Sequence, residues 1–469
     1  MVEYLAQGKR GSADLCAYFF LRASQLTSQG GQCGLLATNT IAQGDTREVG
    51  LDQILTEGWM ILRAVPSRRW PGEAGLEVAH IWLRRGNWHG QCLLDEKPVE
   101  GITPFLTAQG KMQGKPYILL TNANQSFMGT VVLGKGFVLK PEDAYALIAK
   151  APRNKDVLFP YLNGRDLNSR PDQSPSRWII NFHDWPLERA ETYQDCINIV
   201  QEKVKPERSK SNRKIYRDKW WQYAEKCLTL YNTIDGMNRV LVVGQTSKYH
   251  SFIFVPVEMV YDQKLLVFTV QKYGCFAQLQ SLLHAEWVLT FGSTLETRPV
   301  YTPTDCFETY PFLEATDNLD VIGERYYQHR QWLMKKRSEG LTDIYNRFHD
   351  LQETATDIVR LRVLHKEMDE AVAKAYGWDD VDLGHGFHET KQGLRYTISE
   401  AARREVLGRL LKLNHERYAE EVAMGLHEKG AKKGKNRKNG KGPIRGRLGE
   451  TIGQQRELVF EDTSDRGLP

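Results

Sequence analysis

Apolar positions at the start of the chain alternate between helical and strand-like spacing. Three- to four-residue spacing predicts amphipathic helices, and short continuous apolar runs predict buried strands. The pattern predicts helix, strand, helix, strand and strand, over residues 12–26, 34–39, 45–58, 59–65 and 76–85. This order is the closing half of an open α/β sheet, which needs further strands to be complete. We therefore expect the chain to be the C-terminal part of a larger protein.

Residues at the ends of these elements support the prediction. Asp45 or Thr46 is placed to cap the second helix, and Gly58 to end it. The last two strands are joined only by the turn-rich segment PSRRWPGEAG. That connection is too short for a crossover helix, so the strands must pair antiparallel as a hairpin. A sheet of the dehydrogenase type would place a helix there, so the hairpin favours a methyltransferase.

The rest of the chain divides by pattern into three further blocks. Residues 93–315 mix helical and strand-like segments, residues 316–427 are mostly helical, and residues 428–469 form a tail. The clearest strands are predicted over 239–245, 250–262 and 264–270, and the clearest helices over 142–150, 275–292, 320–338, 353–376 and 397–427. The predicted fold class is α/β plus α+β: half of a Rossmann-like sheet, a mixed α+β domain and a helical C-terminal domain.

Positive charge is concentrated near the C-terminus. The chain carries a net charge of +5, yet the segment from Lys429 to Arg447 holds nine basic residues and no acidic one. The remainder is therefore slightly acidic, and a Gly-, Lys- and Asn-rich tail of this kind is expected to be disordered. Composition leaves two interpretations open, an arm that contacts phosphates or a solvated terminus, and favours the second.

Cysteine usage and hydropathy indicate the compartment. The seven cysteines are scattered and form no C-x-x-C pair, so neither a zinc site nor a disulfide framework is indicated. No apolar run is long enough to span a bilayer, and no signal-peptide pattern is present. His284, His349 and His365 lack metal-ligand spacing, and no paired nuclease carboxylates stand out. We expect a cytoplasmic protein without a metal site.

Several long segments resemble one family of enzymes. Residues 12–26 and 34–51 are similar to the region after the catalytic motif in gamma-class, adenine-specific (N6) DNA methyltransferases of type IIG or IIL restriction–modification and phage-defence systems. The similarity continues over PYLNGRDL, YTPTDCFETYPF, GLTDIYNRFHD and LRVLHKEMDEAVAKAYGW, at 160–167, 301–312, 340–350 and 361–378. The resemblance implies that residues 1–92 are the C-terminal half of a methyltransferase domain and that residues 93–315 are a target-recognition domain.

The same resemblance identifies two motifs that this chain lacks. The family binds S-adenosylmethionine with a Gly-rich loop after its first strand, and positions the target adenine with Asn-Pro-Pro-Tyr or Asn-Pro-Pro-Phe. No N-P-P occurs in this chain, and QGKRG at 7–11 has no preceding strand. No catalytic residue is therefore assigned. We expect an upstream polypeptide to supply both motifs, and this chain alone to be inactive.

Three residues of the half-sheet have roles implied by the resemblance. Trp70, in the turn of the hairpin, matches an aromatic residue that stacks on the flipped-out adenine. A tryptophan packed on its own hairpin is the alternative. Asp14 and Leu15 match a motif that borders the adenine end of the cofactor, although an aspartate at a helix start is more often a cap.

Other polar residues are candidates from position and charge. Asn39, Gln43 and Gly44 follow a sheet strand, where α/β proteins bind ligands, although such residues are also common in turns. The segment 203–226 interleaves cations with Tyr216, Trp220, Trp221 and Tyr223, which is typical of DNA contact, whereas a solvated helix is the default alternative. The candidate DNA-binding residues are Lys203, Lys205, Arg208, Lys210, Arg213, Lys214, Arg217, Lys219, Lys248 and His250, with Tyr249 between the last two.

The sequence thus predicts part of a site-specific adenine methyltransferase that acts on double-stranded DNA. The chain would supply target recognition and part of the catalytic fold. A stand-alone DNA-binding specificity module without catalysis is the first alternative, and a poorly folding pseudogene product, with a bare strand edge, is the second.

Overall fold

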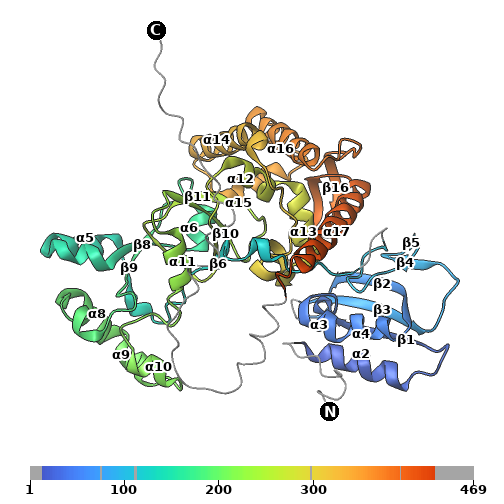
Figure 1. Ribbon diagram of the computed structural model, residues 1–469, viewed down its shortest axis with the longest axis horizontal. Helices are drawn as coiled ribbons and strands as arrows, with labels where there is room; N and C mark the ends of the chain where they lie inside the picture. The colour runs from blue at the N-terminus through green and yellow to red at the C-terminus, as the bar shows by residue number, and fades with distance from the viewer. Residues whose placement is uncertain (1–12, 74–75, 110–113, 296–297, 391, 428–469) are drawn as a thin grey trace, which may run out of the picture. The chain divides into compact units, whose positions relative to one another are not determined.

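A computed structural model describes residues 13–73, 76–109, 114–295, 298–390 and 392–427, which Figure 1 traces from blue to red. The basic tail predicted at 428–469 lies outside the described residues. Residues up to Glu420 belong to one compact unit. Among the helices that the structure describes, none is long and apolar enough to span a membrane.

The first sheet has five strands in the order β1-β3-β2-β4-β5. Strand β3 (Glu77–Arg85) lies between β1 (Gln32–Thr38) and β2 (Trp59–Arg69) and is antiparallel to both, so β1 and β2 run parallel. The predicted hairpin is confirmed, since β2 and β3 pair along most of their length. The short strands β4 (Cys92–Leu94) and β5 (Lys97–Val99) complete the sheet beside β2.

Three helices cover one face of this sheet, as Figure 1 shows: α2 (Leu15–Leu26), α3 (Gly44–Val49) and α4 (Leu51–Thr56). Phe20 of α2, Ile54 of α4 and Ile81 of β3 belong to their shared core. Burial of these apolar side chains stabilises the layer by roughly 2 kcal/mol for each fully buried one.

The prediction of a single helix over 45–58 is wrong, because the helix is interrupted at Gly50 and forms α3 and α4. A side chain at Gly50 would meet the carbonyl oxygen of Thr46 at 3.0 Å and the Cβ of Ala17 at 3.2 Å. The glycine thus lets this turn approach α2 closely. Neither Asp45 nor Thr46 caps the helix, which begins at Gly44. Gly58 ends it as predicted, with φ +85°.

The outer edge of this sheet is open on the side of β1. Within the described residues, β1 pairs with β3 alone. Leu36 on β1 is 51 % exposed, and α2 carries a stripe of exposed apolar side chains at Leu15, Phe19 and Leu26. An edge strand with apolar neighbours of this kind is a surface on which another strand can pair.

Two four-stranded sheets follow. One, in the order β11-β10-β13-β6, is antiparallel. The other, β12-β8-β9-β7, is mixed, since β12 is parallel to β8. The strands are β6 (Ser126–Met128), β7 (Val138–Leu139), β8 (Leu158–Leu162), β9 (Arg177–Ile180), β10 (Arg239–Gly244), β11 (Ile253–Pro256), β12 (Val260–Tyr261) and β13 (Leu265–Phe268).

The prediction of a single strand over 250–262 is wrong, because its two halves belong to different sheets, as β11 and β12. A tight turn separates them, in which the Met259 amide donates to the Val257 carbonyl at 2.8 Å. The Tyr261 hydroxyl holds this turn by donating to the carbonyl of Pro256 at 2.9 Å. Continuous apolar character cannot reveal such a turn, because both halves are buried.

Helices surround these sheets. They are α5 (Pro141–Lys150), α6 (Gly164–Ser169), α7 (Leu187–Ala190), α8 (Gln194–Lys203), α9 (Lys205–Ser209), α10 (Lys214–Asp218) and α11 (Leu228–Ile234). Short 3-10 turns span Asn39–Ala42, Leu120–Asn122, Lys135–Phe137, Pro152–Val157 and Asp317–Leu319, and a π-helical turn spans Pro303–Phe307. The helix predicted at 142–150 is confirmed as α5.

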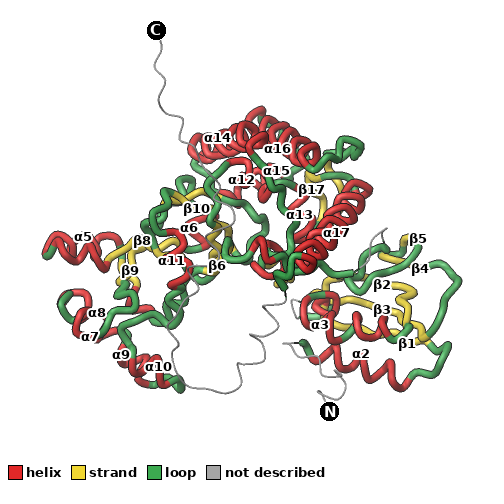
Figure 2. Tube along the Cα trace, viewed as in Figure 1, coloured by secondary structure: helices red, strands yellow, loops and turns green. Residues whose placement is uncertain are grey.

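From Tyr273 onward the chain is mostly helical, as the red tubes of Figure 2 show. The helices are α12 (Tyr273–Gln280), α13 (Leu282–Phe291), α14 (Asp320–Arg337), α15 (Leu341–Phe348), α16 (Thr356–Ala375) and α17 (Glu400–Ala423). Two hairpins interrupt them: β14 (Ser293–Leu295) with β15 (Arg298–Val300), and β16 (Gly386–Thr390) with β17 (Gly393–Thr397). The helix predicted over 275–292 breaks at Ser281, whose hydroxyl caps α13.

One hydrophobic core joins these helices to the antiparallel sheet. Val242 of β10, Phe276 of α12, Trp287 of α13, Leu333 of α14 and Leu361 of α16 all belong to it. The strands and the helices thus pack as one body.

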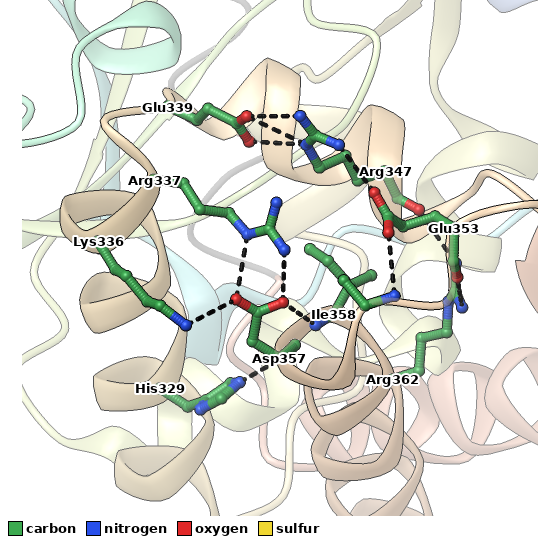
Figure 3. Close-up of polar contacts among 10 residues, drawn as sticks. His329, Lys336, Arg337, Glu339, Arg347, Glu353, Asp357, Ile358 and Arg362 are labelled. Atoms are coloured by element: carbon green, nitrogen blue, oxygen red, sulfur yellow. Dashed lines mark hydrogen bonds and ion pairs between the residues drawn. The ribbon is translucent and has the colours of Figure 1, made fainter.

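Charged side chains join α14, α15 and α16 at their ends (Figure 3). Asp357, in the first turn of α16, accepts from Lys336 at 3.3 Å and from Arg337 at 2.5 Å, both on α14. On α15, Arg347 pairs with Glu339 at 2.7 Å and with Glu353 at 2.8 Å. The Asp357 pairs thus join α14 to α16, and the Arg347 pairs join α15 to the loops on either side of it.

Candidate functional site

The first candidate site lies at the C-terminal ends of the parallel strands β1 and β2, and not at the open lateral edge of β1. The register places Thr38 opposite Val78, and Val78 opposite Arg68. Asn39 follows directly, and its side-chain amide donates to the Ser67 hydroxyl at 3.3 Å. The ends of parallel strands are where α/β sheets bind ligands. The fold thus gathers Asn39, the start of α2 and the tip of the hairpin at one edge.

Asp14 caps α2 at this edge. Its carboxylate accepts from the amide of Cys16 at 3.3 Å, and from the hydroxyls of Thr38 at 3.3 Å and Thr40 at 3.5 Å. The side chain therefore ties the start of α2 to the end of β1, as the capping interpretation predicts. Leu15 beside it is 66 % exposed. It is the residue of this pair that is free to make an apolar contact.

Trp70 lies at the tip of the hairpin between β2 and β3. Its amide donates to the carbonyl of Leu76 at 2.8 Å, and its side chain is 38 % exposed. A side chain at Gly72 would come within 2.5 Å of the indole nitrogen, so the ring lies over its own turn. This is the packing that the alternative interpretation predicts, and stacking on a base would require the indole to move away from Gly72.

The two remaining candidates of this edge differ in their contacts. The Gln43 amide nitrogen donates to the Thr294 hydroxyl at 2.7 Å, and its oxygen accepts from the Thr294 amide at 3.0 Å. Both ends of this side chain are thus used inside the protein. Gly44 begins α3 with φ +46°, and a side chain there would meet nothing within 4 Å. The space beside Gly44 is therefore open to a ligand, whereas the Gln43 side chain is already hydrogen-bonded to Thr294.

Arg208 is a core residue, contrary to the expectation that it contacts DNA. It is 3 % exposed, and its guanidinium donates to the carbonyls of Leu133, Val132 and Gln222 at 2.7 to 3.0 Å. Burial lowers its pKa from the ordinary value. A guanidinium with all its nitrogens directed at main-chain oxygens holds loops together and cannot reach a phosphate.

Three of the four aromatic residues of this segment, Trp220, Trp221 and Tyr223, are also buried, whereas Tyr216 is partly exposed. Trp221 donates to the carbonyl of Trp185 at 2.9 Å, and the Tyr223 hydroxyl to that of Ile180 at 2.6 Å. Trp220 is buried beside them, with the ammonium of Lys205 at 4.9 Å from its ring. The expected DNA contact of these three rings is wrong, because they belong to a hydrophobic core shared with β8, β9 and α8.

The other cations of this segment point outward. All seven are exposed, and within the described residues none is ion-paired with a carboxylate: Lys203, Lys205, Lys210, Arg213, Lys214, Arg217 and Lys219. Arg213 donates to the Tyr216 hydroxyl at 2.8 Å, and Arg217 to the Ser211 carbonyl at 2.5 Å. Unpaired exposed cations on consecutive short helices can neutralise the phosphates of a duplex.

Lys248 and His250 lie in the loop between β10 and β11. Lys248 is exposed and donates to the Asn346 side chain at 2.7 Å. His250 packs edge-on against Tyr301, with ring centroids 5.5 Å apart, and burial lowers its pKa to about 4. It is therefore neutral near pH 7 and adds no positive charge for a phosphate.

The motif PYLNGRDL joins the end of β8 to the start of α6 through Asn163. The Asn163 side chain caps α6 by accepting from the amides of Arg165 at 2.9 Å and Asp166 at 3.2 Å. Asp166 in turn accepts from the amide and hydroxyl of Ser176 at 3.0 and 2.8 Å. The side chains of Asn163 and Asp166 are therefore used to fold this segment. Elsewhere in the described residues, no cluster of His, Cys, Asp and Glu could hold a metal ion.

Comparison with known families decides what the middle of the chain is. Residues 120–314, from just before β6 through β15, match the family model described as MmeI, target recognition domain. This segment is similar to the target recognition domain of MmeI. The matched segment contains the two four-stranded sheets and helices α5 to α13.

Two known proteins extend the similarity beyond the target recognition domain. A solved structure of the Type IIL restriction-modification enzyme MmeI in complex with DNA superposes with a TM-score of 0.64 at 16 % identity, covering 88 % of this chain and 54 % of that one. DNA methyltransferase A of Bacillus subtilis (strain 168) is 21 % identical over 386 residues, which are 77 % of this chain and 41 % of that protein. The fold is thus a mixed α/β fold similar to that of MmeI, and the chain spans about half the length of the proteins it matches.

Proposed function

We propose that this chain is the DNA-reading part of a site-specific adenine-N6 DNA methyltransferase of a restriction–modification or phage-defence system, acting in the cytoplasm. The observation that carries the proposal is the target recognition domain at residues 120–314. Exposed, unpaired cations on α8 to α10 support the DNA binding. The free thiols of all seven cysteines support the cytoplasmic location. The partner is double-stranded DNA.

The role of the first sheet rests on its topology and on the similarity to a DNA methyltransferase. Its strands end together at Asn39 and at the hairpin tip that carries Trp70. In the proposed enzyme, S-adenosylmethionine supplies the methyl group. Leu15 is exposed and suits an apolar contact with the cofactor's adenine, whereas the Asp14 carboxylate already has three donors. The residues of this chain therefore fit one border of a cofactor site, and not a whole site.

The open edge of β1 supports the proposal that a second polypeptide segment completes the enzyme. The sequence contains no Asn-Pro-Pro motif. A further strand added along β1, with a helix beside it, would cover Leu36 and the stripe of Leu15, Phe19 and Leu26. We propose that the cofactor loop and the motif that positions adenine reside on that segment.

The experiment compares methyl transfer by the chain alone with transfer by the chain co-purified with the product of the reading frame upstream. Duplex DNA and S-adenosylmethionine with a labelled methyl group are the substrates. The proposal expects N6-methyladenine only in the mixture. Methylated cytosine, or no transfer by a mixture that forms a stable complex, would contradict it.

A stand-alone specificity module is the second candidate, because the target recognition domain and its helical neighbours share one continuous core within this chain. This alternative expects the chain alone to shift one duplex sequence specifically, and no mixture to methylate. A gel-shift selection from random duplexes, sequenced after binding, provides the site for both experiments.

A further inference from the structure

Side chains from three distant segments meet around Tyr249, in the loop between β10 and β11. The Tyr249 ring stacks on His349, just after α15, with centroids 4.9 Å apart and an interplanar angle of 18°. Its hydroxyl donates to the Asn346 side chain at 3.1 Å, which also accepts from Lys248. The guanidinium of Arg395, on β17, lies 5.5 Å from the same ring.

This cluster concentrates positive charge without a matching carboxylate. The Lys248 ammonium is 5.1 Å from the ring centroid of Tyr249, so both cations border one aromatic side chain. Within the described residues, neither Lys248 nor Arg395 is ion-paired with an acidic side chain. Burial lowers the pKa of His349, and the positive charges of Arg395 and Lys248 lower it further. Two uncompensated cations at one place attract an anion.

The cluster also contains polar atoms whose bonding is incomplete. The Nε of Arg395 and the Nδ1 of His349 are both buried, and neither has a hydrogen-bond partner among the described residues. A buried polar group without a partner costs about 1 to 3 kcal/mol, so an anion that accepted from the Arg395 Nε would recover that free energy. Packing against Tyr249 explains where the Arg395 side chain lies, but it leaves that nitrogen without an acceptor.

We propose that Lys248 and Arg395, with Tyr249 and His349, form a binding site for one phosphate of the DNA backbone. The proposal rests on the proposed function. It extends the DNA-contacting surface beyond residue 314, the end of the matched target recognition domain, into the α15 and β17 region. A guanidinium and an ammonium that both border one ring suit a phosphate, because phosphate accepts several charge-assisted hydrogen bonds at once. The site fixes the position of the duplex and reads no base.

The first test is the salt dependence of duplex binding by the double variant Lys248→Ala/Arg395→Ala. The charge-matched control is Lys366→Ala/Arg404→Ala, which removes two exposed cations that pair with glutamates four residues away. Loss of one phosphate contact lowers the slope of log K against log salt by about 0.9. We expect that change in the double variant, with the preference for the specific site retained. A slope equal to that of the control would overturn the role in DNA binding.

The second test does not depend on DNA. Chain labelled at its histidine rings is titrated with inorganic phosphate and followed by NMR. We expect a saturable shift of the His349 signal in the wild type, its loss in Lys248→Ala/Arg395→Ala, and its retention in Lys248→Arg/Arg395→Lys. Equal melting temperatures of the variants exclude loss of folding.

The two tests together separate the possible results. If phosphate does not shift the His349 signal of the wild-type chain, the proposed binding site is overturned. A phosphate response with an unchanged duplex slope identifies an adventitious ion only, and overturns the DNA contact. A phosphate response in a chain that binds no duplex supports an anion site and refutes the proposed function instead.

Discussion

Arginine side chains of this protein divide into two groups by what their guanidinium groups contact. Arg208 and Arg330 are buried and donate to oxygens inside the fold, Arg330 to Gln280, to Tyr345 and to the carbonyl of Phe252. Arg213 and Arg217 are exposed on or beside α10. In sequence these residues look alike, because each lies among polar neighbours. Burial separates the two roles.

Replacing Arg208 with alanine should reduce stability, because three main-chain carbonyls would lose their buried donor. We expect the free energy of unfolding to fall by about 3 kcal/mol, measured by urea denaturation. Arg213→Ala should change it by less than about 0.5 kcal/mol and weaken duplex binding instead. A stable Arg208→Ala chain with weakened DNA binding would reverse this assignment.

His284 should make stability depend on pH. Its Nδ1 lies 2.9 Å from the Leu279 carbonyl, so it carries the proton, and its Nε2, 3.1 Å from the Tyr301 hydroxyl, accepts. Burial lowers its pKa to about 3. In the unfolded chain this histidine is protonated below about pH 6.5, whereas in the folded chain it stays neutral down to about pH 3. The free energy of unfolding should therefore fall as pH drops from about 6.5 towards 3.

Urea denaturation at pH 7, 6 and 5 measures this effect. His284→Gln should flatten the dependence by about 1 kcal/mol per pH unit below pH 6. The control is His89→Gln, at an exposed position, which should keep the wild-type dependence. Equal slopes in all three proteins would show that His284 titrates normally.

At the scale of elements, ion pairs at helix ends hold α15 between α14 and α16. Lys336 and Arg337 lower the pKa of Asp357 to about 2. Arg362 adds a second connection by donating to the carbonyls of Phe348, Glu353, Arg347 and Asp350, which keeps the loop after α15 in place. That loop begins with His349, so the same contacts support the proposed phosphate site.

Asp357→Asn should destabilise the protein by on the order of 2 kcal/mol at pH 7, since the charged form is favoured in the fold. Because the folded pKa is depressed, this contribution is present above about pH 4 and is lost as pH falls towards 2. The difference from wild type in urea denaturation should therefore shrink over that range. Glu370→Gln, at an exposed pair with Lys366, should change stability by less than about 1 kcal/mol.

At the scale of the whole molecule, the open edge of β1 is the surface at which we propose that a second segment adds. Phe19→Glu with Leu36→Lys alters two exposed side chains, so the chain itself should keep its melting temperature. If a further strand and helix cover this surface, the variant should lose methyl transfer in the mixture and keep duplex binding. Val321→Glu, an equally exposed apolar position on α14, should affect neither. Methyl transfer by the double variant at the wild-type rate would place the second segment elsewhere.

Local pattern determined much of this protein. The spacing of apolar residues predicted α2, α5, α14, α16 and α17, and the short connection predicted the hairpin of β2 and β3, because these features depend on neighbours in sequence. Long segments that resemble the family predicted the similarity to a target recognition domain. The role of Trp70 was predicted from the family resemblance, and it stays a prediction.

The tertiary structure alone decided which polar residues face solvent. Arg208 is buried because loops at Val132 and Gln222 close around it, and the segment 250–262 turns because its halves join different sheets. Tyr249, His349 and Arg395 are far apart along the chain, so no spacing could bring them together. Burial and long-range contact are properties of the folded chain, whereas periodicity is a property of the sequence.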